Sequence, residues 1–139
     1  MRAVETNVLV RLLTRDDPGQ VKAAEDFVSA GAWVSHLVLA ETVWVLAAVY
    51  ELQAPQLAMA VDMLLSHKNL SIQDAEVVSE ALKRYRTKPA VEFSDCLALE
   101  IARKAGYLPL GTVDRDLAKF EGAERLERAD PRGRRAALR

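Results

Sequence analysis

Residues 2–13, RAVETNVLVRLL, contain the change of pattern that decides the fold class. A short apolar run ends at Glu5, and from Asn7 onward apolar residues recur at helical spacing, with Thr6 available as the N-cap. The stretch predicts a short strand that passes directly into a helix, with an acid at the junction. The role of Glu5 then depends on where the other acids of the chain fall.

The same alternation of strand and helix continues along the chain. We expect further strands at residues 32–36, 69–73, 107–113 and 124–128. We expect helices at residues 21–30, 37–52, 55–68, 74–87 and 94–106, the last capped by Ser94, and a helical turn at 114–120. Strands separated by helices predict a parallel sheet with helices on both faces, and such sheets bind ligands beyond the carboxyl ends of their strands.

Composition places the chain among ordinary globular proteins. Its 139 residues suffice for one domain with a real core, and its net charge of −1 gives no global positive field for nucleic acid or an anionic membrane. The longest apolar run, residues 43–50, is far shorter than a membrane span, and we expect no signal peptide. The single cysteine, Cys96, excludes an internal disulfide and fits a reducing cytoplasm, where we expect the protein.

Two acids follow predicted strands, and two lie on apolar faces of predicted helices. Glu5 ends the first strand, and Asp114 ends the strand at 107–113. Glu41 shares its face with Leu37, Val38, Trp44, Val45 and Ala48, and Asp95 shares its face with Val91, Ala98, Leu99 and Ala102. Both helix faces should point inward, where a carboxylate is costly unless it is paired, protonated or bound to a metal.

Each acid also has a purely structural interpretation. Asp95 suits the positive end of a helix dipole, Asp114 could cap the following turn, Asp116 could be a solvated acid, and Glu5 could pair with a nearby arginine. Together, however, four acids without an obvious local partner converge on one edge of the predicted sheet. Clustered carboxylate oxygens suit Mg²⁺ or Mn²⁺, which can activate water to cut a phosphodiester.

At this point the sequence resembles the PIN-domain nucleases, and among them the VapC-type toxins of bacterial toxin–antitoxin pairs. The resemblance rests on VETNVLVRLL at 4–13, SHLVLAETVWVL at 35–46 and FSDCLALEIARKAGYLPLGTVDRDL at 93–117, in this order. It implies a three-layer α/β/α sandwich around a five-stranded parallel sheet ordered 3-2-1-4-5. It also implies an Mg²⁺- or Mn²⁺-dependent ribonuclease, with an RNA substrate, a small antitoxin partner and a homodimer.

The resemblance assigns roles to individual positions of this chain. Catalytic roles fall to Glu5, Glu41, Asp95 and Asp114; metal binding falls to Glu5, Asp95, Asp114 and Asp116; and supporting polar roles fall to Thr6, Asn7 and Thr112. Glu5 departs from the family pattern, which has aspartate there. The extra methylene moves the carboxylate about 1.5 Å further out, so a second hypothesis is a catalytically weakened module that mainly binds its antitoxin or RNA.

Other parts of the chain carry weaker signals. We expect a nuclease domain over residues 1–129 and a flexible basic tail over residues 130–139, which could instead touch phosphates. Met59 and Met63 are expected in the core, or otherwise at a partner surface. His36, His67 and Cys96 lack zinc-site spacing, and the pattern of a phosphoacceptor receiver domain is not matched, because the first strand ends in one acid and not two.

Overall fold

The computed structural model describes residues 1–127 and alternates strands with helices, as the sequence predicts. Its strands are β1 (Arg2–Ala3), β2 (Ala32–Val34), β3 (Leu70–Ile72), β4 (Leu110–Thr112) and β5 (Ala123–Arg125). Its helices are α1 (Thr6–Thr14), α2 (Pro18–Val28), α3 (His36–Ala48), α4 (Ala54–Ser66), α5 (Ala75–Thr87) and α6 (Phe93–Ala105), with a 3₁₀ turn η1 (Leu117–Lys119). The predicted tail at 130–139 lies outside the described residues.

Two predicted helix caps are wrong by one or two residues. Glu5, and not Thr6, is the N-cap of α1, and its side chain accepts a hydrogen bond from the Asn7 backbone N–H. Ser94 lies inside α6, because the Glu92 carbonyl already accepts from the Asp95 and Cys96 N–H groups. The predicted end of α6 is confirmed, since Gly106 takes the left-handed conformation (φ +87°) that favours glycine after a helix.

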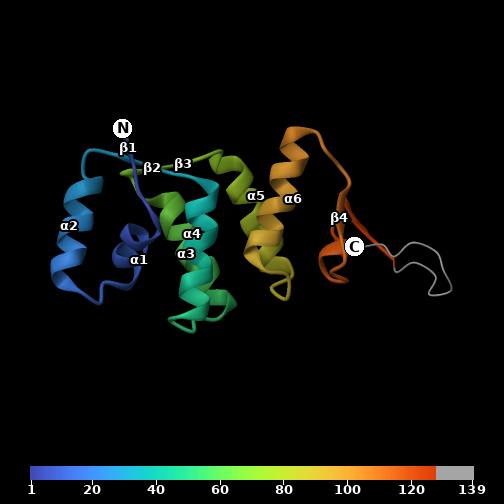
Figure 1. The fold of residues 1–139 in the computed structure, drawn as a ribbon, viewed down its shortest axis with the longest axis horizontal. Helices are drawn as coiled ribbons and strands as arrows, with labels where there is room; N and C mark the ends of the chain where they lie inside the picture. Colours follow the sequence, from blue (N-terminus) through green and yellow to red (C-terminus); the bar gives the residue numbers. More distant parts are fainter. Residues whose placement is uncertain (128–139) are drawn as a thin grey trace, which may run out of the picture.

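The strands form two separate parallel sheets, which differs from the expected single sheet. One sheet has the order β1-β2-β3 and the other pairs β4 with β5. Both fragments agree with the expected order 3-2-1-4-5, but β1 and β4 are not paired. The reason is visible in Figure 1, where α5 and α6 stand between the first sheet and β4.

Helices cover the β1-β2-β3 sheet on one face only. Ala3, Trp33 and Ser71 stand opposite one another in the parallel register and therefore share a face, and all three are exposed. The neighbouring positions Ala32 and Val34 point to the other face and are fully buried. At these strands the structure has two layers, whereas the sequence predicts three.

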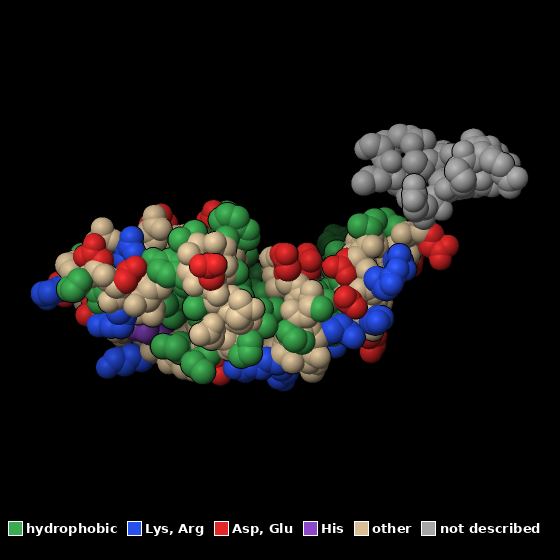
Figure 2. Space-filling model, turned by 90° about the horizontal axis from the view of Figure 1, so that it is seen from below, with side chains coloured by type: hydrophobic (Ala, Val, Ile, Leu, Met, Phe, Trp, Pro, Cys, Tyr) green, Lys and Arg blue, Asp and Glu red, His purple; other side chains and the backbone are tan. Residues whose placement is uncertain are grey.

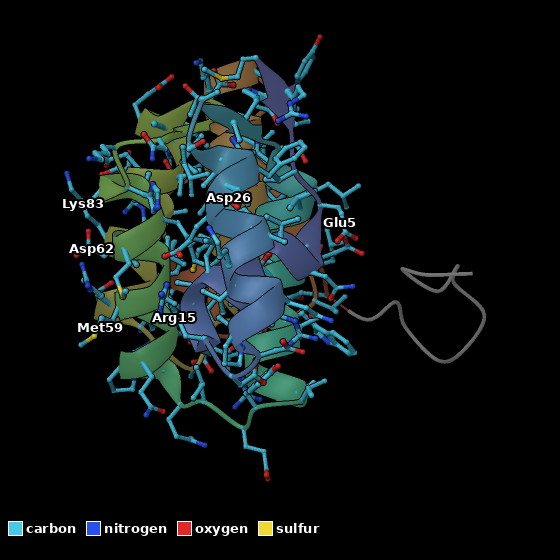
Figure 3. The ribbon with its side chains drawn as sticks, turned by 90° about the vertical axis from the view of Figure 1, so that its left-hand side faces the viewer. Glu5, Arg15, Asp26, Met59, Asp62 and Lys83 are labelled. Atoms are coloured by element: carbon cyan, nitrogen blue, oxygen red, sulfur yellow. The ribbon has the colours of Figure 1, made fainter. Side chains whose placement is uncertain are left out.

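The core lies between the sheet and the helices and continues between α5 and α6. Its largest fully buried side chains include Leu9, Leu39, Leu46, Leu64, Phe93 and Leu99. Cys96 is buried in the core, as expected. Met59 and Met63 are exposed on α4, contrary to the expectation that they pack inside, and Figure 3 places Met59 at the edge opposite Glu5.

The buried carboxylate of Glu100 connects several elements in the second half of the chain. Glu100 on α6 is 4% exposed and accepts hydrogen bonds from Arg84 of α5 and Arg103 of α6, each at 3.2 Å. Arg103 also donates to the Glu121 carbonyl, beside β5. The network therefore joins α5, α6 and the β4-β5 sheet. Within residues 1–127 we find no helix with the length and apolar character needed to span a membrane.

Candidate active site

Glu5 stands where β1 passes into α1, with its side chain at the molecular surface. Its Oε1 atom accepts the Asn7 N–H at 3.2 Å, which satisfies one free donor of the first helical turn. Glutamate is an unusual cap, because its longer chain must fold back toward its own helix. The carboxylate is therefore held at the junction, at the edge of the molecule seen in Figure 3.

Glu41 joins this junction through Thr6. The Thr6 hydroxyl donates a 2.9 Å hydrogen bond to Glu41 Oε1, across 35 residues of sequence. The strand-to-helix turn at the start of α1 thus positions a carboxylate on α3. Glu5, Thr6 and Glu41 form one group, which we call the α1–α3 group.

The face of α3 that carries Glu41 points outward, contrary to the inward orientation expected from its apolar neighbours. Leu37 is 72% exposed and Trp44 is 65% exposed, whereas Leu39, Thr42 and Leu46 on the other side are buried. An almost wholly apolar helix gives no contrast between faces, so its phase could not be predicted from the sequence. Figure 2 shows hydrophobic side chains reaching the surface across the middle of the molecule.

Asp95 and Asp114 form a second group, the α6–β4 group. Asp95 is half-buried in the first turn of α6, and Asp114 follows β4. Burial raises the pKa of Asp95 above its usual range, and the negative charges of Glu92 and Asp114 raise that pKa further. Glu92 was missed by sequence reasoning, although an acid two residues before the predicted helix at 94–106 was a visible signal.

Asp114 also organises the turn that contains it. Its Oδ1 atom accepts the N–H groups of Asp116 and Leu117 at 2.8 and 3.1 Å, and its own N–H donates to the Thr112 hydroxyl. The structural interpretation as a cap is thus correct, and it leaves the second carboxylate oxygen for another role. Asp116 lies 3.7 Å from Lys119, which partly offsets its charge.

The carboxylate oxygens of the α1–α3 group and the α6–β4 group are chemically suited to bind a divalent cation, but the two groups do not lie together. Among residues 1–127, no Lys, Arg or His lies within ion-pair distance of Glu5, Glu41, Glu92, Asp95 or Asp114. Unneutralised carboxylates are the ligands that Mg²⁺ and Mn²⁺ prefer. Nevertheless, no three acidic, histidine or cysteine side chains in the described part of the chain are close enough to hold an ion.

Comparison with known families decides the identity of the domain. A sequence model of the PIN domain matches residues 3–123, which is most of the chain. The chain belongs to the PIN domain family. The matched range includes both acidic groups and the whole of β2, β3 and β4, and it begins within β1 and ends within β5.

The similarity of the chain to individual proteins is weaker than its match to the family model. No curated protein matches the chain. Among solved structures, the PIN domain of this chain is similar to the crystal structure of Mycobacterium tuberculosis VapC20, described as a toxin that cleaves the sarcin–ricin loop. The identity is 19%, the similarity covers 89% of this chain and 98% of that chain, and the TM-score is 0.38.

Proposed function

We propose that this PIN domain is an Mg²⁺- or Mn²⁺-dependent endoribonuclease and acts as the toxin of a toxin–antitoxin pair. The observation that carries the proposal is a set of acids that have no ion-pair partner among residues 1–127: Glu5 after β1, Glu41 on α3, Asp95 at the start of α6 and Asp114 after β4. In a PIN-domain chain this donor set supports phosphodiester hydrolysis. The resemblance to VapC-type toxins supports an RNA substrate, a small antitoxin partner and a cytoplasmic location.

The residues of the two acidic groups would have different roles in the site. We assign metal binding to Glu5, Asp95, Asp114 and Asp116. A bound Mg²⁺ or Mn²⁺ would lower the pKa of a coordinated water and stabilise negative charge on the phosphate. Thr6 fixes Glu41 by its hydrogen bond and leaves the second oxygen of that carboxylate to accept a proton or to orient RNA. Asn7 and Thr112 support the backbone turns that carry Glu5 and Asp114.

The site needs β4 beside β1. Because the carboxyl ends of parallel strands meet at one edge of a sheet, pairing of β1 with β4 would bring Glu5 next to Asp114. It would also complete the five-stranded order 3-2-1-4-5 that the family resemblance implies. We therefore propose that the active form contains this strand pair.

A second candidate function is binding without efficient cleavage. Glu5 favours it, because its carboxylate is longer than the family's aspartate and already caps α1. The exposed apolar side chains of α3, Leu37 and Trp44, are available to an antitoxin or a second copy. In this case the chain would act mainly by holding its antitoxin or RNA.

Digestion of RNA separates the two functions. Incubation with a mixed RNA pool in Mn²⁺, in Mg²⁺ and with a chelator should give cleavage that depends on the metal. Retained RNA binding without cleavage in either metal would favour the binding module. Cleavage that persists in the chelator would contradict the metal-dependent mechanism.

A further inference from the structure

Within residues 1–127, β1 pairs with a strand on one of its edges only. The Val4 N–H donates to the Trp33 carbonyl at 3.1 Å, so Arg2 and Val4 direct their hydrogen-bonding groups toward β2. Hydrogen-bonding groups alternate sides along a strand in a parallel ladder, and those of Ala3 therefore point to the opposite edge. The backbone N–H and carbonyl of Ala3 can therefore form hydrogen bonds with another strand.

In the described part of the chain, β4 also pairs on one edge only, with β5. The Leu110 N–H donates to the Gly122 carbonyl at 2.8 Å, and the Leu126 N–H donates to the Thr112 carbonyl at 2.7 Å. Leu110 and Thr112 thus face β5, and the N–H and carbonyl of Gly111 point away from it. A sheet of two strands with three residues each is well below the size that is stable alone.

The exposed sheet face adds a second sign of a missing partner. Parallel sheets are normally covered on both faces. Here Ala3, Trp33 and Ser71 are all exposed on one face, and Trp33 is 40% exposed. Both the edge and one face of the β1-β2-β3 sheet are therefore incomplete.

The β4 strand of the same chain is held away from this edge. Figure 1 places β4 at the far side of α5 and α6 from β1, along the longest axis of the molecule. The β4-β5 sheet is fixed to α6 because Arg103 donates to the Glu121 carbonyl and packs against Gly122. Glu100 in turn binds Arg103 and Arg84, so the unit includes α5.

We propose that the missing strand comes from a second copy of this chain, whose β4 pairs in parallel with β1, and that the exchange is reciprocal. One chain carries both free edges, so a two-fold dimer satisfies both with the same contact made twice. The inference rests on the proposed function for the identity of the site. It adds that each active site is built from two chains.

The backbone geometry selects a register for this pairing. If Ala3 stands opposite Thr112, its N–H can bind the Gly111 carbonyl and its carbonyl can accept the Val113 N–H. Glu5 then stands opposite Asp114, because each lies two residues beyond the end of its strand. The α1–α3 group of one copy thus meets the α6–β4 group of the other, and exposed Val113 stands beside buried Val4.

Cross-linking of full-length chains tests the exchange without RNA. In the proposed register Arg2 stands opposite Gly111, and both sites accept cysteine: Arg2 is exposed, and a Cβ on Gly111 meets Leu126 at an ordinary 3.6 Å. Arg2→Cys and Gly111→Cys chains of different mass are mixed, refolded together and treated with a short bifunctional maleimide. Met59→Cys, an exposed site away from Glu5, replaces Arg2→Cys as the control. Native Cys96 is buried and does not compete.

The exchange predicts a covalent heterodimer of Arg2→Cys and Gly111→Cys chains, at least about tenfold above the Met59→Cys control. The Arg2→Cys, Gly111→Cys double variant tests whether the two positions can be cross-linked within one chain. A product linked only within single chains would show that the chain completes its own sheet and would overturn the exchange. The absence of both products would show that the edges do not meet, and would overturn it as well.

A mixing experiment then connects the exchange to cleavage. Glu41→Gln chains and Asp114→Asn chains should each be inactive, and refolding them together should restore about a quarter of wild-type cleavage, because half of the dimers would have one intact site. No restoration, with an active wild type, would overturn the exchange. Heterodimer cross-links with a wild type that cuts no RNA would uphold the exchange and overturn only the proposed nuclease.

Discussion

The Thr6 hydroxyl donates a 2.9 Å hydrogen bond to Glu41 Oε1 and so fixes the start of α1 to the middle of α3. This bond links the residue after Glu5 to the second acid of the α1–α3 group. It gives Thr6 a defined role, which is to position a carboxylate and not to cap its own helix.

Thr6→Val should therefore lower the free energy of unfolding by about 0.5–1 kcal/mol, because it removes the donor of this bond and keeps the side-chain shape. Thr6→Ser retains the hydroxyl and should stay close to the wild type. Urea denaturation of the three proteins measures the difference. Equal stability of Thr6→Val and Thr6→Ser would show that the bond contributes nothing.

Asp95 should make the metal-free protein less stable as the pH rises. Burial and the charges of Glu92 and Asp114 raise its pKa in the folded state, so folding favours the protonated form and stability is lost as pH increases through that range. Asp95→Asn should melt at a higher temperature than the wild type at pH 7 in chelator. This advantage should vanish below pH 3.8, the ordinary aspartate pKa, where the carboxyl is protonated in both states.

The matched control for this titration is Asp62→Asn. Asp62 is an exposed acid on α4, paired with Arg86 at 3.4 Å and placed at the edge opposite Glu5 in Figure 3. Its substitution should not raise the melting temperature at pH 7. A higher melting temperature for both variants would indicate a general effect of net charge.

Glu5→Asp should raise metal-dependent cleavage at least about tenfold, which corresponds to about 1.4 kcal/mol in the barrier. Aspartate is a favoured N-cap, so the bond to the Asn7 N–H can be retained while the carboxylate is drawn back by about one C–C bond. Its melting temperature without metal should shift only slightly. Single-turnover digestion of RNA gives the rate; an unchanged or slower rate would show that the site has adapted to glutamate.

Glu100→Ala should destabilise the fold by about 3–5 kcal/mol, because it leaves Arg84 and Arg103 without the buried carboxylate that they share. Glu80→Ala removes an exposed partner of Lys83 on α5 and should change stability by less than about 0.5 kcal/mol. Urea denaturation of both variants checks the contrast. A similar small effect at both positions would show that the Glu100 network does not fasten α5 and α6.

Local signals in the sequence predicted local structure well. Gly106 ended α6 because glycine readily adopts the left-handed conformation found there. The alternation of strands and helices predicted parallel pairing, and every observed pair is parallel. These features depend on residues close together in the chain.

The arrangement of distant parts was less predictable. The outward orientation of Glu41 follows from the packing of α3 against α1 and α4. The sequence of an apolar helix does not indicate which of its faces will be buried. The separation of β1 from β4 depends on the position of the α5–α6 pair, which Glu100 fastens through contacts 16 residues apart in sequence. Neither feature has a local signature.

The proposed nuclease activity requires that the acidic residues support metal-dependent RNA cleavage. The decisive measurement is the Mn²⁺-dependent cleavage rate of Asp95→Asn beside that of Asp62→Asn, with both variants verified as folded. Asp95→Asn should lose cleavage by on the order of 10²-fold or more, since a misplaced or missing ligand costs about that much, while Asp62→Asn should cut at the wild-type rate. Equal cleavage by the two variants would contradict the metal-dependent nuclease.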